Sequence, residues 1–496
     1  MDGSFRVIRI TILMVIVIVC NRTPPMPITA AISTRGQNQP TQIAFDCITV
    51  SQVPQGECEA LVAIYHDTEG HNWHKDTGWL QTAQPCNWYA VICRNKHVTH
   101  LELSNNNLTE ELPAEIGNLF NLERLTLDQN NLRSIPAEIG NLLNLERLDL
   151  RVNALSSIPP EIGSLSNLER LDLSSNKLTY IPPEIGNLSS LQSLSLSSNE
   201  LSNIPPEIGN LSKLEAFRLT RNKVRNIPPE IGNLSNLRWV SLSANELSSI
   251  PPEIGNLDLI DLFLNANKLS SVPPEIGNLS NLVSLELANN QLTSIPPVIG
   301  SLPKLRDLHL NANKLSSIPS EISNLSTNEE CSLALPYPFY CLSINLAYNR
   351  LVIHDETLTT MLAEYGGGWA KTQAIAPTNV IATALSSNTV QLNWTPIRFK
   401  EKDGHYEINL VNNGIYSVHG KTVTKSDYIY MVSGLMADTD YTFQIRTYTA
   451  PHFGVFSFST EDDQQNELWS EYSEEAIVRT LPLTYTQTFL PYIQTP

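Results

Sequence analysis

Leucine and asparagine recur along the middle of the chain in a fixed phrase, LxLxxNxL, in which x varies. Eleven copies of the phrase cover residues 98–352, and successive asparagines lie 22 to 24 residues apart, except that the last gap is 36. A fixed period in this range predicts a solenoid, in which every repeat forms one coil of the same local structure. The asparagines are Asn106, Asn130, Asn153, Asn176, Asn199, Asn222, Asn245, Asn267, Asn290, Asn313 and Asn349.

Within one copy the apolar positions alternate as in a short strand. In LERLDLSSN, Leu168, Leu171 and Leu173 face one way if the stretch around Leu171 is extended, and Arg170 and Asp172 face the other way. Burying one leucine contributes about 1.5–3 kcal/mol. A single coil cannot bury its own leucine row, so the coils are expected to stack with their strands side by side.

Two further features of the phrase predict how each coil turns. An asparagine amide both donates and accepts hydrogen bonds, so the eleven asparagines are expected to form a ladder that satisfies turn backbone in their own and neighbouring coils. The segment IPPEIG, as at residues 158–163, predicts an extended outer arc, because proline fixes φ and removes a donor. Gly163 is expected to permit a tight return.

These repeats resemble the leucine-rich repeats, most closely the 22–24-residue types of plant and bacterial proteins. Four positions depart mildly from the pattern, with Phe217, Val224, Val240 and Ile344 in place of leucine. The resemblance implies an α/β solenoid of about eleven repeats with a parallel sheet on its concave side.

Segments on either side of the repeats are expected to cap the leucine core. At the front, residues 45–97 contain a predicted amphipathic helix with Leu61, Ile64 and Tyr65 on one face. At the back, residues 353–375 contain DETLTTMLAEYGGGW, which predicts a short helix, followed by a linker. Exposed solenoid ends require such caps.

Aromatic residues in the front segment allow two interpretations. The Cys86-x6-Cys93 segment with Trp88 resembles the N-terminal cap of plant-type leucine-rich repeat proteins. Trp73, Trp79 and Trp88 are then buried cap residues, the interpretation we favour, although three tryptophans can also form a sugar-stacking platform.

Cysteine spacing predicts disulfides. Apart from Cys20, the chain has six cysteines, and pairing the neighbours in sequence gives Cys47–Cys58, Cys86–Cys93 and Cys331–Cys341. An even number of cysteines in an exported chain is typical of disulfides, although six allow fifteen connectivities. A metal site is the weaker alternative, because His71-x-x-His74 and the cysteine pairs lack a CxxC partner.

From residue 376 the period changes to two. Alternation in TVQLNW, HYEINLV, DYIYMVSGL, DYTFQIRTYT and WSEYSEEAIVRT predicts an antiparallel sandwich. Residues 376–481 resemble a fibronectin type III domain: Trp394 matches its early-strand tryptophan, Leu435 and Tyr441 its corner, and WSEYS its last strand. A tail at 482–496 follows.

The N-terminus has the pattern of a signal peptide over residues 1–31. Arg6 and Arg9 accompany the apolar run IRITILMVIVIVC, and Thr29-Ala30-Ala31 provides small residues for cleavage. A retained membrane anchor and lipidation at Cys20 are the alternatives. The tail has no helix of transmembrane length, so we expect no transmembrane span in the mature chain, which is secreted or held at the cell surface.

Charge and motifs exclude several functions. The net charge is −18, with −10 in residues 97–351 and −8 in residues 352–496. Without a basic patch, nucleic acid and anionic membrane surfaces are unlikely partners. No GxSxG, HExxH, P-loop or GxGxxG occurs, so we predict no enzyme activity, no cofactor and no metal.

We therefore predict a non-enzymatic, exported binding protein, of bacterial rather than plant type, that recognises a protein ligand through the concave strands. A carbohydrate-binding or cell-wall adhesin and an accessory module of an extracellular enzyme system are the alternatives. Outward positions of the strands supply the candidate site, because exposed tryptophan with arginine is typical of binding hot spots. The candidates are Trp239, Phe263, Arg218 and Arg221 at the centre and an arginine ladder of Arg124, Arg147 and Arg170.

A long loop between the last two strands of the sandwich, residues 449–468, is a second candidate. It carries aromatic and acidic residues, but an insertion without function explains it equally well.

Overall fold

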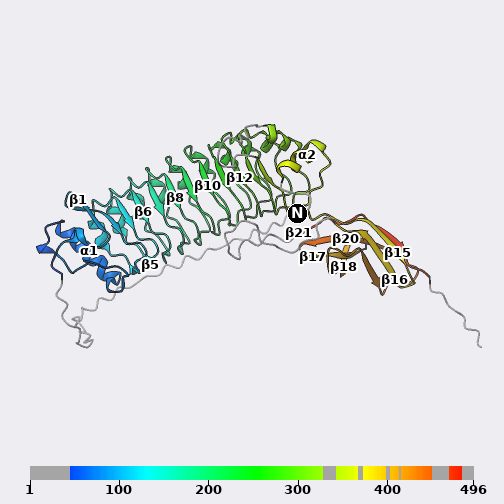
Figure 1. The fold of residues 1–496 in the computed structure, drawn as a ribbon, viewed down its shortest axis with the longest axis horizontal. Helices are drawn as coiled ribbons and strands as arrows, with labels where there is room; N and C mark the ends of the chain where they lie inside the picture. Colours follow the sequence, from blue (N-terminus) through cyan, green and yellow to red (C-terminus); the bar gives the residue numbers. More distant parts are fainter. Residues whose placement is uncertain are drawn as a thin grey trace, which may run out of the picture. The chain divides into compact units, whose positions relative to one another are not determined.

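A computed structural model describes residues 45–327, 342–366, 372–397, 403–412, 415–449 and 468–482. These residues form a solenoid followed by a β-sandwich, as the two sequence periods predict (Figure 1). Within the described ranges, no helix is both long enough and apolar enough to cross a membrane.

The strands of the solenoid form one sheet of 12 strands. Its first strand, β1 (Val91–Arg94), is antiparallel to β2 (His97–Glu102), and all later neighbours are parallel. Figure 1 shows them side by side along the repeats. The later strands are β4 (Arg124–Thr126), β6 (Arg147–Asp149), β7 (Arg170–Asp172), β8 (Ser193–Ser195), β9 (Ala216–Arg218), β10 (Trp239–Ser241), β11 (Asp261–Phe263), β12 (Ser284–Glu286), β13 (Asp307–His309) and β14 (Ser343–Asn345).

The core of the solenoid consists of the repeated leucines and isoleucines. In the repeat at residues 168–185, Leu168, Leu171, Leu173 and Ile185 are each at most 1% exposed. The four non-leucine positions noted above fit the same core, since Phe217, Val224 and Val240 are fully buried and Ile344 is 2% exposed.

The outer side of each coil differs from the extended arc that we expected. The first proline of IPPEIG is extended, but the chain then forms a single turn of 3₁₀ helix, because proline is well suited to the first helical position. These turns are η4 (Ala114–Asn118), η5 (Ala137–Asn141), η6 (Pro160–Ser164), η7 (Pro183–Asn187), η8 (Pro206–Asn210), η9 (Pro229–Asn233), η10 (Pro252–Asn256), η11 (Pro274–Asn278), η12 (Pro297–Ser301) and η13 (Ser320–Thr327). Two early coils also pair β3 (Thr109–Glu111) with β5 (Asn131–Ser134).

Glycine in this segment has a different role from the predicted one. A Cβ atom on Gly163 would lie 2.3 Å from the backbone oxygen of Glu184 in the next coil, so glycine is needed for close stacking. The tight turn falls elsewhere, on the residue before each ladder asparagine. That residue has a left-handed φ in all eleven copies, for example 56° at Ser198.

The asparagine ladder is present. The Oδ1 atom of Asn199 accepts from the backbone N–H of Leu178 at 3.0 Å, and its Nδ2 atom donates to the oxygens of Leu173 and Leu196, each at 3.0 Å. Each asparagine from Asn130 to Asn349 repeats these bonds to its own and neighbouring coils. One amide thus satisfies three backbone groups at the turn.

Both ends of the ladder are closed by residues outside the repeats. At the front, Asn106 accepts from the N–H of Lys75 at 2.7 Å and donates to its carbonyl at 3.0 Å. At the back, Gln373 accepts from the N–H of Leu351 at 3.0 Å and donates to the oxygen of Leu346 at 3.0 Å. Gln373 thereby takes the place of the next asparagine.

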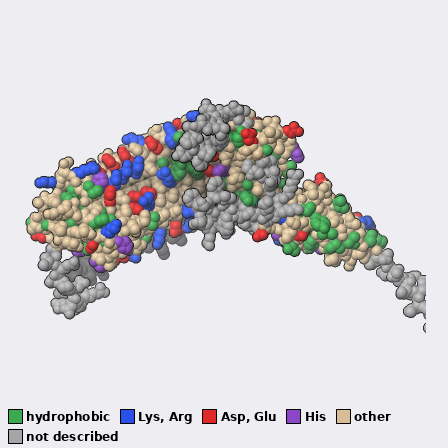
Figure 2. All heavy atoms as spheres, in the orientation of Figure 1, with side chains coloured by type: hydrophobic (Ala, Val, Ile, Leu, Met, Phe, Trp, Pro, Cys, Tyr) green, Lys and Arg blue, Asp and Glu red, His purple; other side chains and the backbone are tan. Residues whose placement is uncertain are grey.

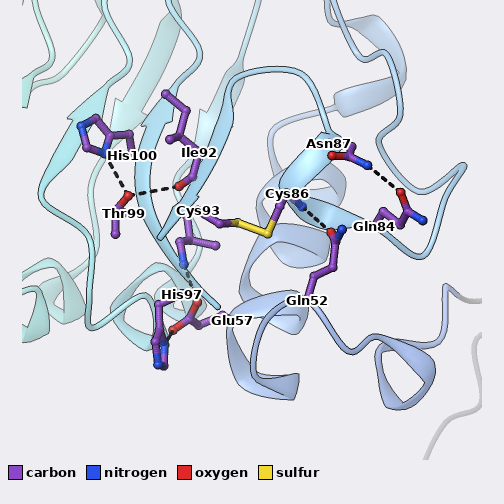
Figure 3. Close-up of a disulfide and its surroundings, with 11 residues drawn as sticks. Gln52, Glu57, Gln84, Cys86, Asn87, Ile92, Cys93, His97, Thr99 and His100 are labelled. Carbon is purple, nitrogen blue, oxygen red and sulfur yellow. Dashed lines mark hydrogen bonds and ion pairs between the residues drawn. A yellow bond between two sulfur atoms is a disulfide. The ribbon is translucent and has the colours of Figure 1, made fainter. Parts of the chain in front are cut away.

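The front cap contains the predicted helix, α1 (Gln55–Asp67), with 3₁₀ turns η1 (Cys47–Thr49), η2 (Gly70–Asn72) and η3 (Pro85–Asn87). Two predicted disulfides, Cys47–Cys58 and Cys86–Cys93, are formed, and Figure 3 shows the second. Glu57 on α1 is 3% exposed and accepts from the N–H of Val98 at 2.8 Å, while its other carboxylate oxygen lies 2.6 Å from Nδ1 of His97. The helix is therefore joined directly to β2.

The tryptophans of the front cap are buried. Trp73, Trp79 and Trp88 are 7%, 1% and 2% exposed and pack around Tyr65 and one another, with the rings of Trp73 and Trp79 5.0 Å apart. They cover the leucine core and present no sugar-stacking face.

The back cap contains α2 (Glu356–Tyr365), which begins at Asp355, whose side chain accepts from the N–H of Leu358 at 2.9 Å. Gln373 and Ala374, which we placed in a linker, are 3% and 0% exposed against the last coil. The predicted Cys331–Cys341 disulfide lies outside the described residues.

The sandwich has two antiparallel sheets. One contains β15 (Thr378–Ala384), β16 (Thr389–Thr395) and β19 (Ile429–Ser433). The other contains β18 (Ile415–Lys421), β17 (Gly404–Asn412), β20 (Asp440–Thr449), β21 (Leu468–Trp469) and β22 (Ala476–Arg479). Trp394, Tyr406 and Phe443 fill the core, and the Tyr441 hydroxyl accepts from the N–H of Met436 at 2.8 Å at the predicted corner.

The WSEYS segment does not form the single last strand that we expected. Its Trp469 ends β21, and the rest of the segment separates β21 from β22, which both pair with β20. The hydroxyls of Ser470 and Ser473 accept from the N–H groups of Thr447 and Ile445 at 2.8 and 3.0 Å. The N–H groups of both serines still donate to the oxygens of Thr447 and Ile445, so the hydroxyls replace only the accepting half of the strand pairing.

Candidate ligand-binding surface

Two rows of outward side chains run across the solenoid sheet. The leading row consists of the residue immediately before the central buried residue of each strand, and the trailing row of the residue immediately after it. The strand register aligns the leading row as His100, Arg124, Arg147, Arg170, Ser193, Ala216, Trp239, Asp261, Ser284, Asp307 and Ser343. The same pairings align the trailing row as Glu102, Thr126, Asp149, Asp172, Ser195, Arg218, Ser241, Phe263, Glu286, His309 and Asn345.

Arg218, Trp239 and Phe263 make contact across three successive strands, β9 to β11. The Arg218 guanidinium lies 4.4 Å from the centre of the Trp239 ring, within the range of a cation–π interaction. The Trp239 and Phe263 rings are 5.3 Å apart at 49°. All three side chains are partly exposed. We call these three residues the aromatic centre.

Arg221, the fourth predicted member, lies in the turn after β9 and not in a strand. It occupies the left-handed position in the turn after β9, with φ of 59°, and its N–H donates to the oxygen of Ser243 at 2.9 Å. The turn, and not the sheet face, therefore fixes its position.

The predicted arginine ladder lies on β4, β6 and β7. Arg124 pairs with Glu102 at 3.4 Å, whereas Arg147 and Arg170 form no ion pair or side-chain hydrogen bond within the described residues. The three arginines line a hollow of about 360 Å³ together with Asp149, Asp172, Ser193, Ser195 and Arg218. Basic and acidic side chains are interspersed over this part of the molecule (Figure 2).

The carboxylates of this hollow are held by groups of the solenoid itself. Asp149 accepts from the N–H of Arg151 at 3.2 Å and lies 3.6 Å from its guanidinium, while Asp172 accepts from the N–H of Ser174 at 2.9 Å. Burial nevertheless raises the pKa of Asp149 to about 6, helped by the charges of Asp128 and Asp172 and opposed by Arg151. Asp149 is therefore partly protonated in mildly acidic solution.

Carboxylates dominate the later strands. Asp261 and Asp307 have no ion pair or side-chain hydrogen bond within the described residues, and burial raises the pKa of each. Glu286 accepts from Nδ2 of Asn265 at 3.1 Å and pairs with His309 at 2.8 Å. Burial opposes protonation of His309, but Glu286 and Asp307 outweigh it and raise its pKa.

The predicted site residues on the strands form two adjoining groups, and Arg218 belongs to both. Arg218, Trp239 and Phe263 form one contact group, and the arginine ladder lies on earlier strands. Asp261 and Asp307 were not predicted as site residues, although their place in the leading row is visible in the sequence. The candidate loop lies outside the described residues, apart from its ends.

The described residues contain no group of three or more His, Cys, Asp or Glu side chains placed to hold a metal ion.

Comparison with known families agrees with this architecture. Residues 160–258 match the leucine-rich repeat region family, residues 97–119, 120–178 and 280–326 match further leucine-rich repeat families, and residues 375–462 match the fibronectin type III domain. The chain is a leucine-rich repeat protein with a C-terminal fibronectin type III domain.

Solved leucine-rich repeat structures are similar to parts of this chain. A leucine-rich repeat protein of Leptospira interrogans is 33% identical over 52% of this chain and 75% of its own, with a TM-score of 0.38. The PEPR1–AtPEP1 structure is 26% identical over 65% of this chain and 55% of its own, with a TM-score of 0.46. An internalin from Listeria monocytogenes is 23% identical over 51% of this chain and 74% of its own, with a TM-score of 0.40.

Proposed function

We propose that this leucine-rich repeat protein binds a protein ligand on the solenoid sheet, the side predicted to be concave, with the aromatic centre as its anchor. The contact of Arg218, Trp239 and Phe263 carries the proposal. Arginine and tryptophan are enriched among residues that dominate binding energies. A protein surface supplies the apolar side chains that such an anchor would cover.

The proposal includes export to the cell exterior or its surface, in a bacterium. Two disulfides in the front cap support export, because disulfides persist in oxidising compartments. Leucine-rich repeats and type III domains are interaction modules in most proteins, which supports a binding role without catalysis.

Paired variants test the aromatic centre. Trp239→Ala/Phe263→Ala removes both rings from the sheet. Phe120→Ala/Tyr180→Ala is the matched control, because these aromatics are 55% and 60% exposed and lie outside the strands of the sheet. Each immobilised protein is used to capture partners from extracellular material of its source, and captured proteins are quantified by mass spectrometry.

We expect specific proteins to be captured by the wild-type and control proteins and lost with the Trp239/Phe263 variant, while all three retain similar melting temperatures. Equal capture by all three would refute the anchor. Binding on a glycan array that depends on the two rings, with no protein captured, would instead favour the carbohydrate alternative.

A further inference from the structure

The leading row changes chemistry in one direction along the solenoid. It presents arginines at β4, β6 and β7, small side chains at Ser193 and Ala216, an aromatic ring at Trp239, and then carboxylates at Asp261 and Asp307. The strand register makes this one continuous line across the sheet. A ligand lying along it meets a cation first, an apolar surface next and anions last.

The charged side chains at the two ends of this line form no ion pair within the described residues, although Asp149 and Asp172 lie beside the arginines and the charge of His309 acts on Asp307. Arg147 and Arg170 have no ion-pair partner within the described residues, and neither have Asp261 and Asp307. By contrast, Asp149 and Asp172 in the trailing row are held by nearby N–H groups. A ligand of complementary charge would pair with the leading row without displacing internal bonds.

The basic end of the line is only one side chain wide. Asp149 and Asp172 in the trailing row lie directly beside Arg147 and Arg170 on the same strands. A broad acidic surface would meet these carboxylates and be repelled, because opposing like charges are costly at an interface. An extended segment can place a single carboxylate over the arginines and avoid them.

Strand spacing sets the distances along such a segment. Neighbouring strands lie about 4.8 Å apart, so Trp239 is roughly 15–20 Å from the two unpaired arginines and roughly 5–15 Å from the two aspartates. At about 3.3 Å per residue, these spans correspond to about five residues on one side and two to four on the other.

Resting on the function proposed above, we propose that the ligand contributes an extended peptide segment that crosses the strands along the leading row. It places an aspartate or glutamate against Arg147 and Arg170, an apolar or aromatic side chain on Trp239 and Phe263, and a lysine or arginine against Asp261 and Asp307. The charge order along the row selects one direction of the segment.

Selection from a random peptide library tests this assignment. Peptides displayed on phage are selected on the wild-type protein and on a charge-exchanged variant, Arg147→Glu/Arg170→Glu/Asp261→Lys/Asp307→Lys. The four side chains are at least partly exposed and unpaired, so we expect the variant to fold, and circular dichroism and its melting temperature check this.

We expect wild-type peptides to carry an acidic residue on one side of an apolar residue and a basic residue on the other, at the spacings given. The exchanged variant should select the opposite order. A selected peptide should lose at least about tenfold in affinity on the half-exchanged variants, as is typical of broken charge pairs at an interface.

Peptides without this charge order, equal affinity for wild-type and exchanged proteins, or no enriched peptide would overturn the inference. None of these results affects the anchor, which is judged by the Trp239/Phe263 variant. Conversely, ordered peptides that bind this variant as well as wild type would show that the aromatic centre, and not the charge order, was wrongly assigned.

Discussion

Asparagine is required at each turn because no other short side chain both donates two hydrogen bonds and accepts one there. The Asn199 amide contacts the backbone of three residues in two coils while only 7% exposed. Aspartate would lose both donors, and leucine would leave the N–H of Leu178 without its acceptor and remove one donor from each of two carbonyls. The recurrence of this residue in eleven copies therefore reflects a local need that is the same in every coil.

Asn199→Ala tests this role in the middle of the array. Loss of the amide leaves the N–H of Leu178 unsatisfied, which should cost about 1–3 kcal/mol. The oxygens of Leu173 and Leu196 each lose one of two donors and keep the bonds from Asn176 and Asn222. Chemical denaturation should show a lower midpoint. Asn203→Ala is the control, since Asn203 is exposed and its side chain bonds only to Ser202 among the described residues. This change should alter stability by less than about 0.5 kcal/mol. An unchanged midpoint for Asn199→Ala would contradict the ladder.

Asp149 gives the solenoid a pH-dependent stability. Because burial raises its pKa from 3.8 to about 6, the folded protein binds its proton more tightly than the unfolded chain does. The contribution of Asp149 to the free energy of unfolding is therefore fully present below about pH 4 and is lost as the pH rises through 6. Ionised Asp149 lowers stability by at most about 3 kcal/mol.

Asp149→Asn should raise the melting temperature at pH 8 and leave it nearly unchanged at pH 4, because asparagine keeps an acceptor for the N–H of Arg151 and cannot ionise. Thermal unfolding at both pH values checks this. A similar change at both values would show that burial of the Asp149 charge is not the cause.

At the scale of the element, the outer turn of each coil is set by its neighbour. The 3₁₀ turns stack so closely that a Cβ on Gly186 would lie 2.3 Å from the backbone oxygen of Glu207. Backbone atoms cannot yield as a flexible side chain can, so this glycine is fixed by contact between coils.

Gly186→Ala should therefore destabilise the protein by about 1–3 kcal/mol, the usual effect of overpacking. Gly56→Ala is the matched control, because Gly56 lies in α1 and its added Cβ meets nothing within 4 Å. That change should stabilise the helix by up to about 1 kcal/mol. We expect the denaturation midpoint to fall for Gly186→Ala and to rise for Gly56→Ala. An unchanged midpoint for Gly186→Ala would show that the coils have room to separate.

Elements with a strong hydrophobic periodicity could be predicted from the sequence. Elements whose conformation depends on contacts with a neighbouring coil or strand could not. The strands around Leu171 and the sandwich strand around Phe443 follow from alternation alone. The segment PEIG was expected to be extended because its prolines were read without the neighbouring coil. WSEYS was read as a single strand, because the hydroxyls of Ser470 and Ser473 that accept from β20 in place of backbone oxygens leave no trace in a hydrophobic pattern.

The candidate site shows the same limit. Trp239 and Phe263 could be identified because large apolar residues stood at outward positions of the repeat. The stacking of Arg218 on Trp239 depends on side-chain conformation. Whether Arg147 and Asp307 form ion pairs depends on the side chains of every neighbouring strand. Neither property is contained in the repeat pattern.

At the scale of the whole molecule, the two ends of the solenoid need stabilising contacts of their own, because each coil contacts only its neighbours and a terminal coil has one neighbour fewer. The turn backbone of each coil is satisfied by an asparagine of the next coil, so at either end of the array a residue outside the repeats must supply the missing hydrogen bonds. Lys75 does so at the front through its backbone, and Gln373 at the back through its side chain. The role of Gln373 could not be predicted from the sequence, because α2 separates this residue from the last repeat.

Gln373→Ala should open the last coil without unfolding the array. The N–H of Leu351 loses its partner, while the carbonyl of Leu346 loses one of two donors and keeps Asn349. Solenoids open most readily where the stack ends. Hydrogen exchange should quicken at Leu351 by about tenfold or more, since a lost buried hydrogen bond costs about 1–3 kcal/mol. Exchange at Leu178, deep in the array, should remain unchanged and is the internal control. If both amides quicken together, the coils unfold as one cooperative unit and Gln373 stabilises the whole solenoid; if neither does, Gln373 is not the end of the ladder.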